Sequence, residues 1–199
     1  MSKKLAIILS AIGHPVLLFV YVYFVIVVTN PLYGWFNMLY PSVLLLFFVL
    51  FACGIVYLLY KLNYIQSLYP KLKKGRIIIY LTFIVVFFFC FQFLSRTAYA
   101  PFVNLFLIIV LLALSILVFI TYFWNVSGYL YLWGCAIGYC LGIGLISGIN
   151  NLFPVIIMFL FSGLLATARL RLHKNTLLQV VLSFLSGLLP LLFLFLIIK

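Results

Sequence analysis

Long, uninterrupted apolar runs are the feature that most constrains this chain. A helix needs about 20 apolar residues to cross the hydrocarbon core of a bilayer. The sequence contains seven runs of roughly that length, and all twelve Lys and Arg residues lie outside them. The runs are Leu5–Val28, Pro41–Tyr60, Ile77–Leu94, Phe102–Trp124, Tyr129–Ile149, Leu152–Ala168 and Leu177–Ile198.

Composition shows what surrounds these runs. Hydrophobic residues make up 69% of the 199, and only 6% are charged, whereas a soluble domain carries roughly 25% charged residues. Because such a chain cannot cover a globular surface with polar groups, its outer solvent must be lipid. We predict an all-α polytopic transmembrane bundle of about seven spans (six to seven), forming one integral membrane domain over residues 1–199.

The basic residues predict the orientation. With seven spans, the N-terminus and three of the loops share one face, and ten of the twelve Lys and Arg residues fall on it. Cytoplasmic loops carry an excess of such residues, so this face and the N-terminus are predicted to be cytoplasmic. The ten are Lys3, Lys4, Lys61, Lys71, Lys73, Lys74, Arg76, Arg169, Arg171 and Lys174.

The chain contains no Asp and no Glu. This excludes carboxylate proton relays, carboxylate-held magnesium or calcium and an aspartyl-phosphate intermediate. The cations need an external anion, and lipid phosphates offer about 1 kcal/mol per basic residue near an anionic surface. We predict anionic or phosphate-bearing lipids as partners; the alternative is that these residues only fix topology. We predict no metal, cofactor or nucleic acid.

Glycine recurs every four residues in the fifth run, at Gly134, Gly138 and Gly142. Such a row of small residues lets two helix backbones approach closely. We favour helix packing within the monomer, with a homo-oligomer or another membrane protein packed on this row as the alternative.

Three polar segments could carry chemistry: residues 71–76, 125–129 and 169–179. Two spans separate the first from the second, and two separate the second from the third. Because an even number of crossings returns the chain to the same face, all three segments can meet at one membrane surface.

The third segment reads ARLRLHKNTLLQV over residues 168–180. It resembles the third signature of the type 2 phosphatidic acid phosphatase superfamily, S-R-x5-H-x3-D. Arg169 occupies the Arg position, whereas Asn175 occupies the His position and Gln179 the Asp position.

Weaker likenesses run along the rest of the chain. Ser127-Gly128-Tyr129 resembles the second signature, S-G-H, with Tyr in place of His. Lys73 and Arg76 lie where the first signature, K-x6-R-P, would supply cations, although its spacing is not kept. The opening LSAIGHP, residues 9–15, is similar to the I-S-x3-H-P stretch of the superfamily's bacterial integral-membrane branch.

The resemblance implies a phosphatase-like core and metal-independent hydrolysis of lipid phosphates or diphosphates. In such enzymes Arg and Lys clamp the phosphoryl oxygens, the third-signature His attacks phosphorus, its Asp orients it, and the second-signature His protonates the leaving group. Arg169, Arg76 and Lys73 are the expected phosphate-binding residues. Asn175 cannot act as the nucleophile, because an amide nitrogen is not basic. A side-chain amide at the Asp position cannot stabilise an imidazolium by charge.

Two substitutes for the missing groups can be considered. The phenol of Tyr129, with an ordinary pKa near 10, is a poor but conceivable proton donor. His173 lies two residues before Asn175; an extended segment would place both on one side, about 6.6 Å apart, and a helix would separate them by roughly 200°. Otherwise His173 is an interfacial histidine. We read His14 as a packing group at a kinked His-Pro step.

The sequence therefore predicts a phosphatidic acid phosphatase-like protein in the bacterial inner membrane that binds phosphate-bearing lipid and is divergent or catalytically inactive. One alternative is an active lipid phosphatase or diphosphatase that uses His173. The other is a non-enzymatic structural subunit of a membrane protein complex.

Overall fold

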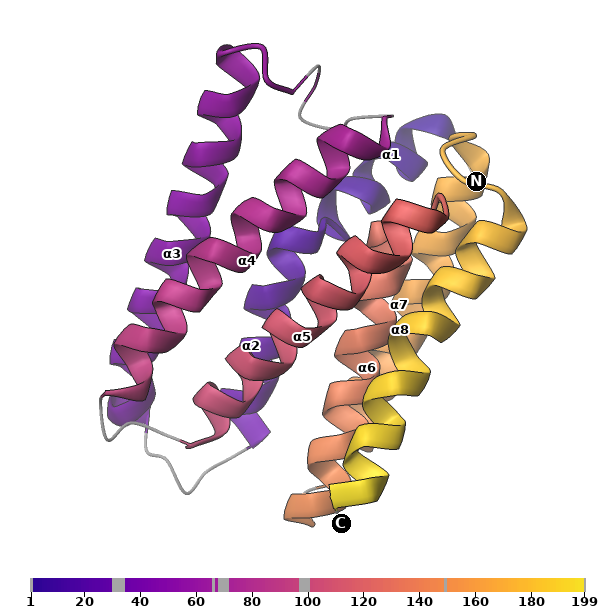
Figure 1. The fold of residues 1–199 in the computed structure, drawn as a ribbon. Coiled ribbons are helices and arrows are strands. Elements are labelled where there is room, and N and C mark those ends of the chain that lie inside the picture. Colours follow the sequence, from indigo (N-terminus) through magenta and orange to yellow (C-terminus); the bar gives the residue numbers. More distant parts are fainter. Residues whose placement is uncertain are drawn as a thin grey trace. The chain divides into compact units, whose positions relative to one another are not determined.

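The structure, a computed structural model, describes residues 2–29, 35–65, 67, 72–96, 101–148 and 150–198. These residues form eight α-helices and no strand (Figure 1). Six helices are long and apolar enough to cross a membrane, and the bent pair α1–α2 brings the number to seven if it counts as one span. The prediction of an all-α polytopic bundle is confirmed. The helices are α1 Lys3–Ile12, α2 Pro15–Thr29, α3 Trp35–Lys61, α4 Lys73–Ser95, α5 Pro101–Phe123, α6 Gly128–Ser147, α7 Leu152–Arg171 and α8 Leu177–Ile198.

The first apolar run does not form one continuous helix. It divides at Gly13 and His14 into α1 and α2, whose axes differ by 55°. Proline lacks the N–H that would continue α1 and clashes with the preceding turn, so Pro15 instead begins α2. The predicted kink at Pro15 is thus a complete break in the helix.

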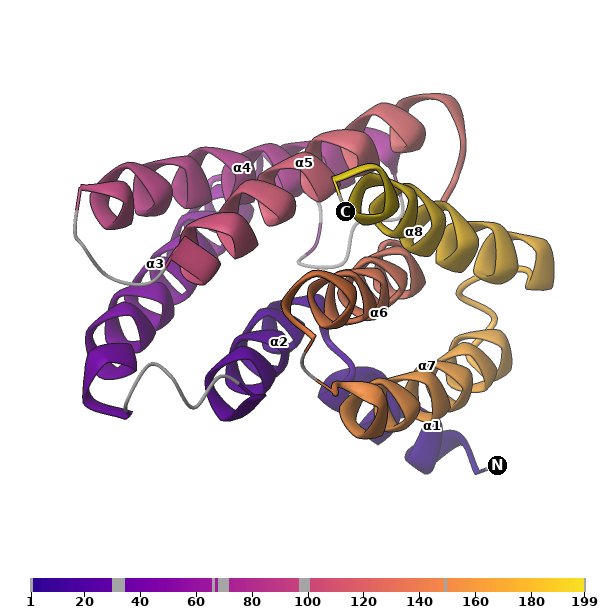
Figure 2. The ribbon, with the colours of Figure 1, turned by 90° about the horizontal axis from the view of Figure 1, so that it is seen from below.

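The chain divides into two compact units, one made of Met1–Asn30 and Val126–Lys199 and the other of Pro31–Asn125. The single domain expected over residues 1–199 stays a prediction, and each unit is described by itself. In the first unit α6 packs against α2, α7 and α8, while α1 packs against α7 (Figure 2). The spanning part of α6 is 72% buried, compared with 28% for α7 and for α8. Helix α6 is therefore the core of this unit.

Glycines bring α6 and α8 into backbone contact. A Cβ atom at Gly134 would collide with the carbonyl oxygen of Phe184, and one at Gly187 would collide with the carbonyl oxygen of Tyr131. A Cβ at Gly138 would lie 2.9 Å from the carbonyl oxygen of Leu188. The remaining glycine of the row, Gly142, faces the Phe195 ring. The row thus packs within the chain, as favoured from the sequence, and association with a second copy through it stays untested.

In the second unit α4 packs against both α3 and α5. Many large apolar side chains of this unit, such as Phe47 in α3 and Phe119 in α5, are exposed, as expected for surfaces that face lipid. Some hydroxyls within the spans donate backward along their own helices, for example Thr82 to the carbonyl of Ile78 at 2.9 Å. Such local bonds satisfy polar groups where lipid offers no partner.

Candidate functional site

The guanidinium of Arg169 is the centre of the candidate site. Arg169 lies in the last turn of α7 and is partly buried. Its Nε donates to Oδ1 of Asn175 at 3.2 Å, and its Nη1 donates to Oγ of Ser10 at 3.4 Å. Its Cζ stands 4.2 Å from the centre of the Tyr129 ring, a cation–π geometry. Four segments of the first unit therefore meet at one cation: the end of α1, the start of α6, the end of α7 and the turn after it.

The turn after α7 brings Asn175 back to Arg169. The backbone N–H of His173 donates to the Leu170 carbonyl at 3.0 Å, and that of Lys174 donates to the Arg169 carbonyl at 3.2 Å. His173 has a φ of 50°, the left-handed conformation that commonly ends a helix. The chain reverses at this point, so Asn175 returns beside the arginine six residues before it.

The next helix begins with a reciprocal cap. The N–H of Gln179 donates to Oγ1 of Thr176 at 3.3 Å, and the N–H of Thr176 donates to Oε1 of Gln179 at 3.1 Å. This pattern is a capping box, in which each side chain satisfies a backbone donor at a helix start. Gln179, which occupies the Asp position of the signature, therefore has a structural role in starting α8.

The start of α6 is fixed by α8. The N–H of Ser127 donates to Oγ of Ser183 at 2.8 Å, and that hydroxyl donates in turn to the carbonyl of Gln179. The Ser127 side chain is 2% exposed, and its hydroxyl has no hydrogen-bond partner among the described residues. It does not cap the first turn of α6, which contains Gly128 and Tyr129. Backbone N–H groups of a first helical turn lack intrahelical partners and favour anions.

His14 is a member of the site that the sequence analysis assigned to packing. It lies at the break between α1 and α2, and its ring forms a T-shaped pair with the Tyr129 ring, with centroids 5.6 Å apart and planes at 90°. Its Nδ1 accepts the N–H of Val16 at 3.2 Å. One signal could have identified it: Ser10 and His14 are polar, stand four apart in an apolar run, and ionisable residues within spans are rare and usually functional.

The structure does not place His173 beside Arg169. Its side chain is exposed. Its backbone is in the left-handed conformation, whereas the sequence analysis considered only an extended segment and a helix. Among the described residues, no hydrogen bond from this imidazole to the Arg169 cluster is present. A catalytic role for His173 gains no support from its position.

Lys73 and Arg76 belong to the second unit, so they are not placed relative to Arg169. Lys73 Nζ donates to the carbonyl oxygens of Tyr122 at 3.4 Å and Phe123 at 3.2 Å, which end α5. Arg76 Nη1 donates to Oδ1 of Asn125 at 3.4 Å. Both cations thus hold the end of α5. Lys71, also counted on the basic face, lies outside the described residues.

The charge of Arg169 has no acidic counterpart, because the sequence contains neither Asp nor Glu. Its contacts include an amide oxygen, a hydroxyl and an aromatic ring. In the described part of the chain, no group of three or more His, Cys, Asp or Glu side chains could hold a metal ion. The site therefore offers hydrogen-bond donors and one fixed positive charge, which is suited to an anion.

Comparison with protein-family models, with curated proteins and with solved structures found no match for this chain.

Proposed function

We propose that this protein is a phosphatidic acid phosphatase-like membrane protein that binds the phosphate of a lipid at Arg169 without hydrolysing it. The observation that carries the proposal is that the Asn175 amide, the Ser10 hydroxyl and the Tyr129 ring fix the Arg169 guanidinium in a chain that contains no Asp or Glu. Arginine is the residue best suited to phosphate, because its planar fork can bind two oxygens at once. The nearby first turn of α6 adds backbone donors.

The absence of hydrolysis follows from the groups at the reacting positions. Asn175 is engaged with Arg169, and Gln179 is engaged in the cap of α8. His14 cannot replace them as a nucleophile: its Nδ1 accepts a backbone N–H, so the proton of the neutral ring lies on Nε2. Phosphoryl transfer to an enzyme group needs an activated nucleophile, and losing one removes nearly all of the rate.

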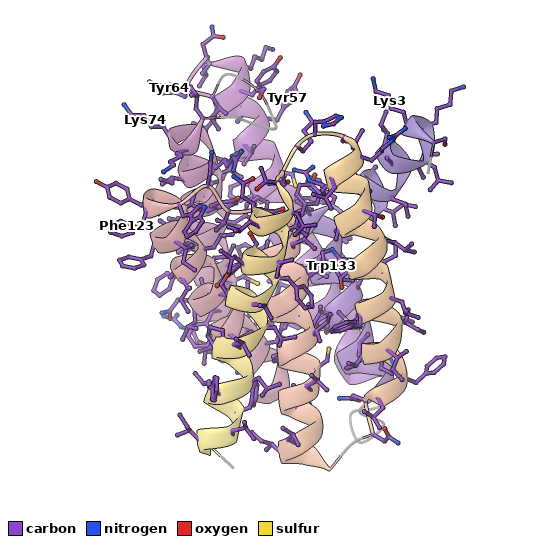
Figure 3. The ribbon with its side chains drawn as sticks, turned by 90° about the vertical axis from the view of Figure 1, so that its right-hand side faces the viewer. Lys3, Tyr57, Tyr64, Lys74, Phe123 and Trp133 are labelled. Atoms are coloured by element: carbon purple, nitrogen blue, oxygen red, sulfur yellow. The ribbon has the colours of Figure 1, made fainter. Side chains whose placement is uncertain are left out.

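We place the protein in the bacterial inner membrane with its N-terminus in the cytoplasm. Within the first unit, the N-terminus and the α7–α8 turn lie at the same end, opposite the C-terminus (Figure 1). Lys3, Lys4, Arg169, Arg171 and Lys174 are therefore gathered at that end, as the positive-inside rule requires of a cytoplasmic face. Lys3 points away from the helices there (Figure 3).

The proposal is tested with purified protein in nanodiscs that contain either phosphatidic acid or only phosphatidylcholine. We expect tighter association with phosphatidic acid and no phosphate release from phosphatidic acid or prenyl diphosphate. Arg169→Ala should weaken binding about tenfold or more, because hydrogen bonds to a charged group contribute about 1.5–3 kcal/mol. Arg171→Ala is the matched control, since it removes the same charge from an exposed position in the same turn.

Two results would overturn the proposal. Phosphate release that is lost in His173→Ala would show an active phosphatase. Equal binding by the wild type, Arg169→Ala and Arg171→Ala would show that Arg169 does not hold the lipid phosphate.

A further inference from the structure

The break in the first apolar run is held in a fixed place by α6. The indole Nε1 of Trp133 donates to the carbonyl of Gly13 at 3.2 Å, and this bond is buried. A Cβ atom at Gly13 would lie 2.8 Å from a methyl group of Leu165, so the break also fits closely against α7. Irregular backbone at membrane depth is tolerated where it is buried in protein or lines a cavity. Broken helices in membrane proteins often form binding sites.

The hydrogen bond from Val16 determines the protonation form of His14. A backbone N–H can only donate, so Nδ1 must carry a lone pair and the neutral ring must carry its proton on Nε2. The same bond satisfies a backbone donor in the first turn of α2, so taking up a proton on Nδ1 would break this cap. His14 is therefore built as a neutral Nε2–H donor.

This donor and the guanidinium share one neighbour. The His14 and Tyr129 rings form a T-shaped pair with their centroids 5.6 Å apart, and Cζ of Arg169 lies 4.2 Å from the centre of the Tyr129 ring. Arg169 belongs to α7, His14 lies at the break just before α2, and Tyr129 lies in the first turn of α6. Both donors therefore contact one aromatic ring, and because the sequence contains no Asp or Glu, no carboxylate side chain of this chain can bind them.

We propose that His14 is a second ligand of the anion at Arg169, and that it donates its Nε2–H as a neutral group to an oxygen of the same phosphate. The inference rests on the proposed function and deepens it. The Tyr129 ring sets the separation of the two donors. The break in the first run is thus part of the binding site. In a continuous helix the Val16 N–H would bond to a backbone carbonyl, and Nδ1 of His14 could not accept it as it does here.

Two variants separate the donor from the cap. In His14→Asn, Oδ1 can take the place of Nδ1 and accept the Val16 N–H, because Asn is a good capping residue. The shorter Asn side chain has no group at the Nε2 position, so the donor is lost. In His14→Gln, the amide nitrogen takes the Nε2 position and the cap is lost. Phosphatidic acid affinity should fall about three- to tenfold in His14→Asn, as for a neutral hydrogen bond, and less in His14→Gln. His173→Asn, at the other histidine of the chain, should bind as the wild type does.

The direct test is the nitrogen spectrum of the full-length protein labelled with 15N-histidine in nanodiscs, with His173→Gln used to assign the signals. We expect the His14 ring to carry its proton on Nε2 alone. Its Nε2 signal should shift when phosphatidic acid replaces phosphatidylcholine, and Arg169→Ala should abolish that shift.

The outcomes distinguish this inference from the proposed function. Suppose Arg169→Ala weakens binding, the Nε2 signal does not shift when phosphatidic acid replaces phosphatidylcholine, and His14→Asn binds as tightly as the wild type. The role of His14 would then be wrong, and the proposed function would stand. A proton found on Nδ1 would also overturn the role of His14. If Arg169→Ala binds as tightly as the wild type, the proposed function fails, and the role of His14 in that site fails with it.

Discussion

The contact between α6 and α8 and the cluster at Arg169 both belong to the first unit but are built in opposite ways. In the contact, Gly134 and Gly187 allow backbone to meet backbone, and side chains are excluded. In the cluster, side chains from several segments gather around one charge and meet through neutral oxygens and a ring. The first arrangement leaves no room for a ligand. The second holds the positive charge of Arg169, which no Asp or Glu of this chain can neutralise.

The difference shows where lipid recognition can reside. A backbone contact between helices contributes stability, because close approach increases van der Waals packing in a solvent that is itself apolar. In the proposed function, the Arg169 cation instead contributes affinity for a lipid phosphate. Changes in the contact should therefore alter stability, and changes in the cluster should alter binding.

The largest effect should follow from filling the contact. In Gly134→Leu, the new side chain would have to displace the backbone of α8 at Phe184. Overpacking typically costs 1–3 kcal/mol, and here we expect a loss of unfolding free energy of about 3 kcal/mol or more. Steric trapping in bicelles measures it. Gly163→Leu is the control, because a Cβ at Gly163 meets no atom within 4 Å. Equal losses in both variants would refute the close contact.

The next effect concerns binding alone. Arg169→Lys keeps the charge but removes the planar fork, so the bonds to Asn175 and Ser10 cannot both form. We expect phosphatidic acid affinity to fall by about 1–2 kcal/mol, less than in Arg169→Ala, with unfolding free energy changed by under about 1 kcal/mol. Native mass spectrometry of retained lipid reports the first quantity. A lysine variant with full affinity would mean that the charge alone is recognised.

A smaller effect should come from the cap of α8. Thr176→Ala removes one half of the capping box with Gln179, and loss of such a cap costs about 1 kcal/mol. Unfolding free energy should fall by that amount, whereas lipid affinity should stay within twofold of the wild type. A large loss of affinity would assign Thr176 or Gln179 to the binding site itself.

The smallest effect should come from the second unit. Lys73→Met removes the ammonium that meets the last carbonyls of α5, an interaction of about 0.3–1 kcal/mol. We expect a stability change of that size and a minor change in phosphatidic acid affinity. An affinity loss comparable to that of Arg169→Ala would show that Lys73 also clamps the phosphate, as the sequence resemblance implies.

The helices were predictable because their signal is local. Apolar runs and a four-residue glycine repeat are visible in the sequence, and both determine structure over short distances. The six-residue separation of Arg169 from Asn175 is also local, so one turn suffices to bring them together.

The rest depends on contacts between distant segments. Ser10 meets Arg169 across 159 positions, and Trp133 meets Gly13 across 120. The partners of Lys73 are backbone carbonyls, which every residue has and no sequence pattern marks. The importance of His14 depends on where the break leaves its ring. The role of Lys73 as a phosphate ligand stays a prediction.

The central claim is that the guanidinium of Arg169 holds a lipid phosphate. Solid-state NMR of protein labelled with 13C at the arginine Cζ atoms, in bilayers containing phosphatidic acid, measures carbon–phosphorus couplings directly. We predict one strong coupling from a rigid arginine, retained in Arg171→Lys and absent in Arg169→Lys. A spectrum in which the strong coupling is absent, or survives Arg169→Lys, would contradict the claim.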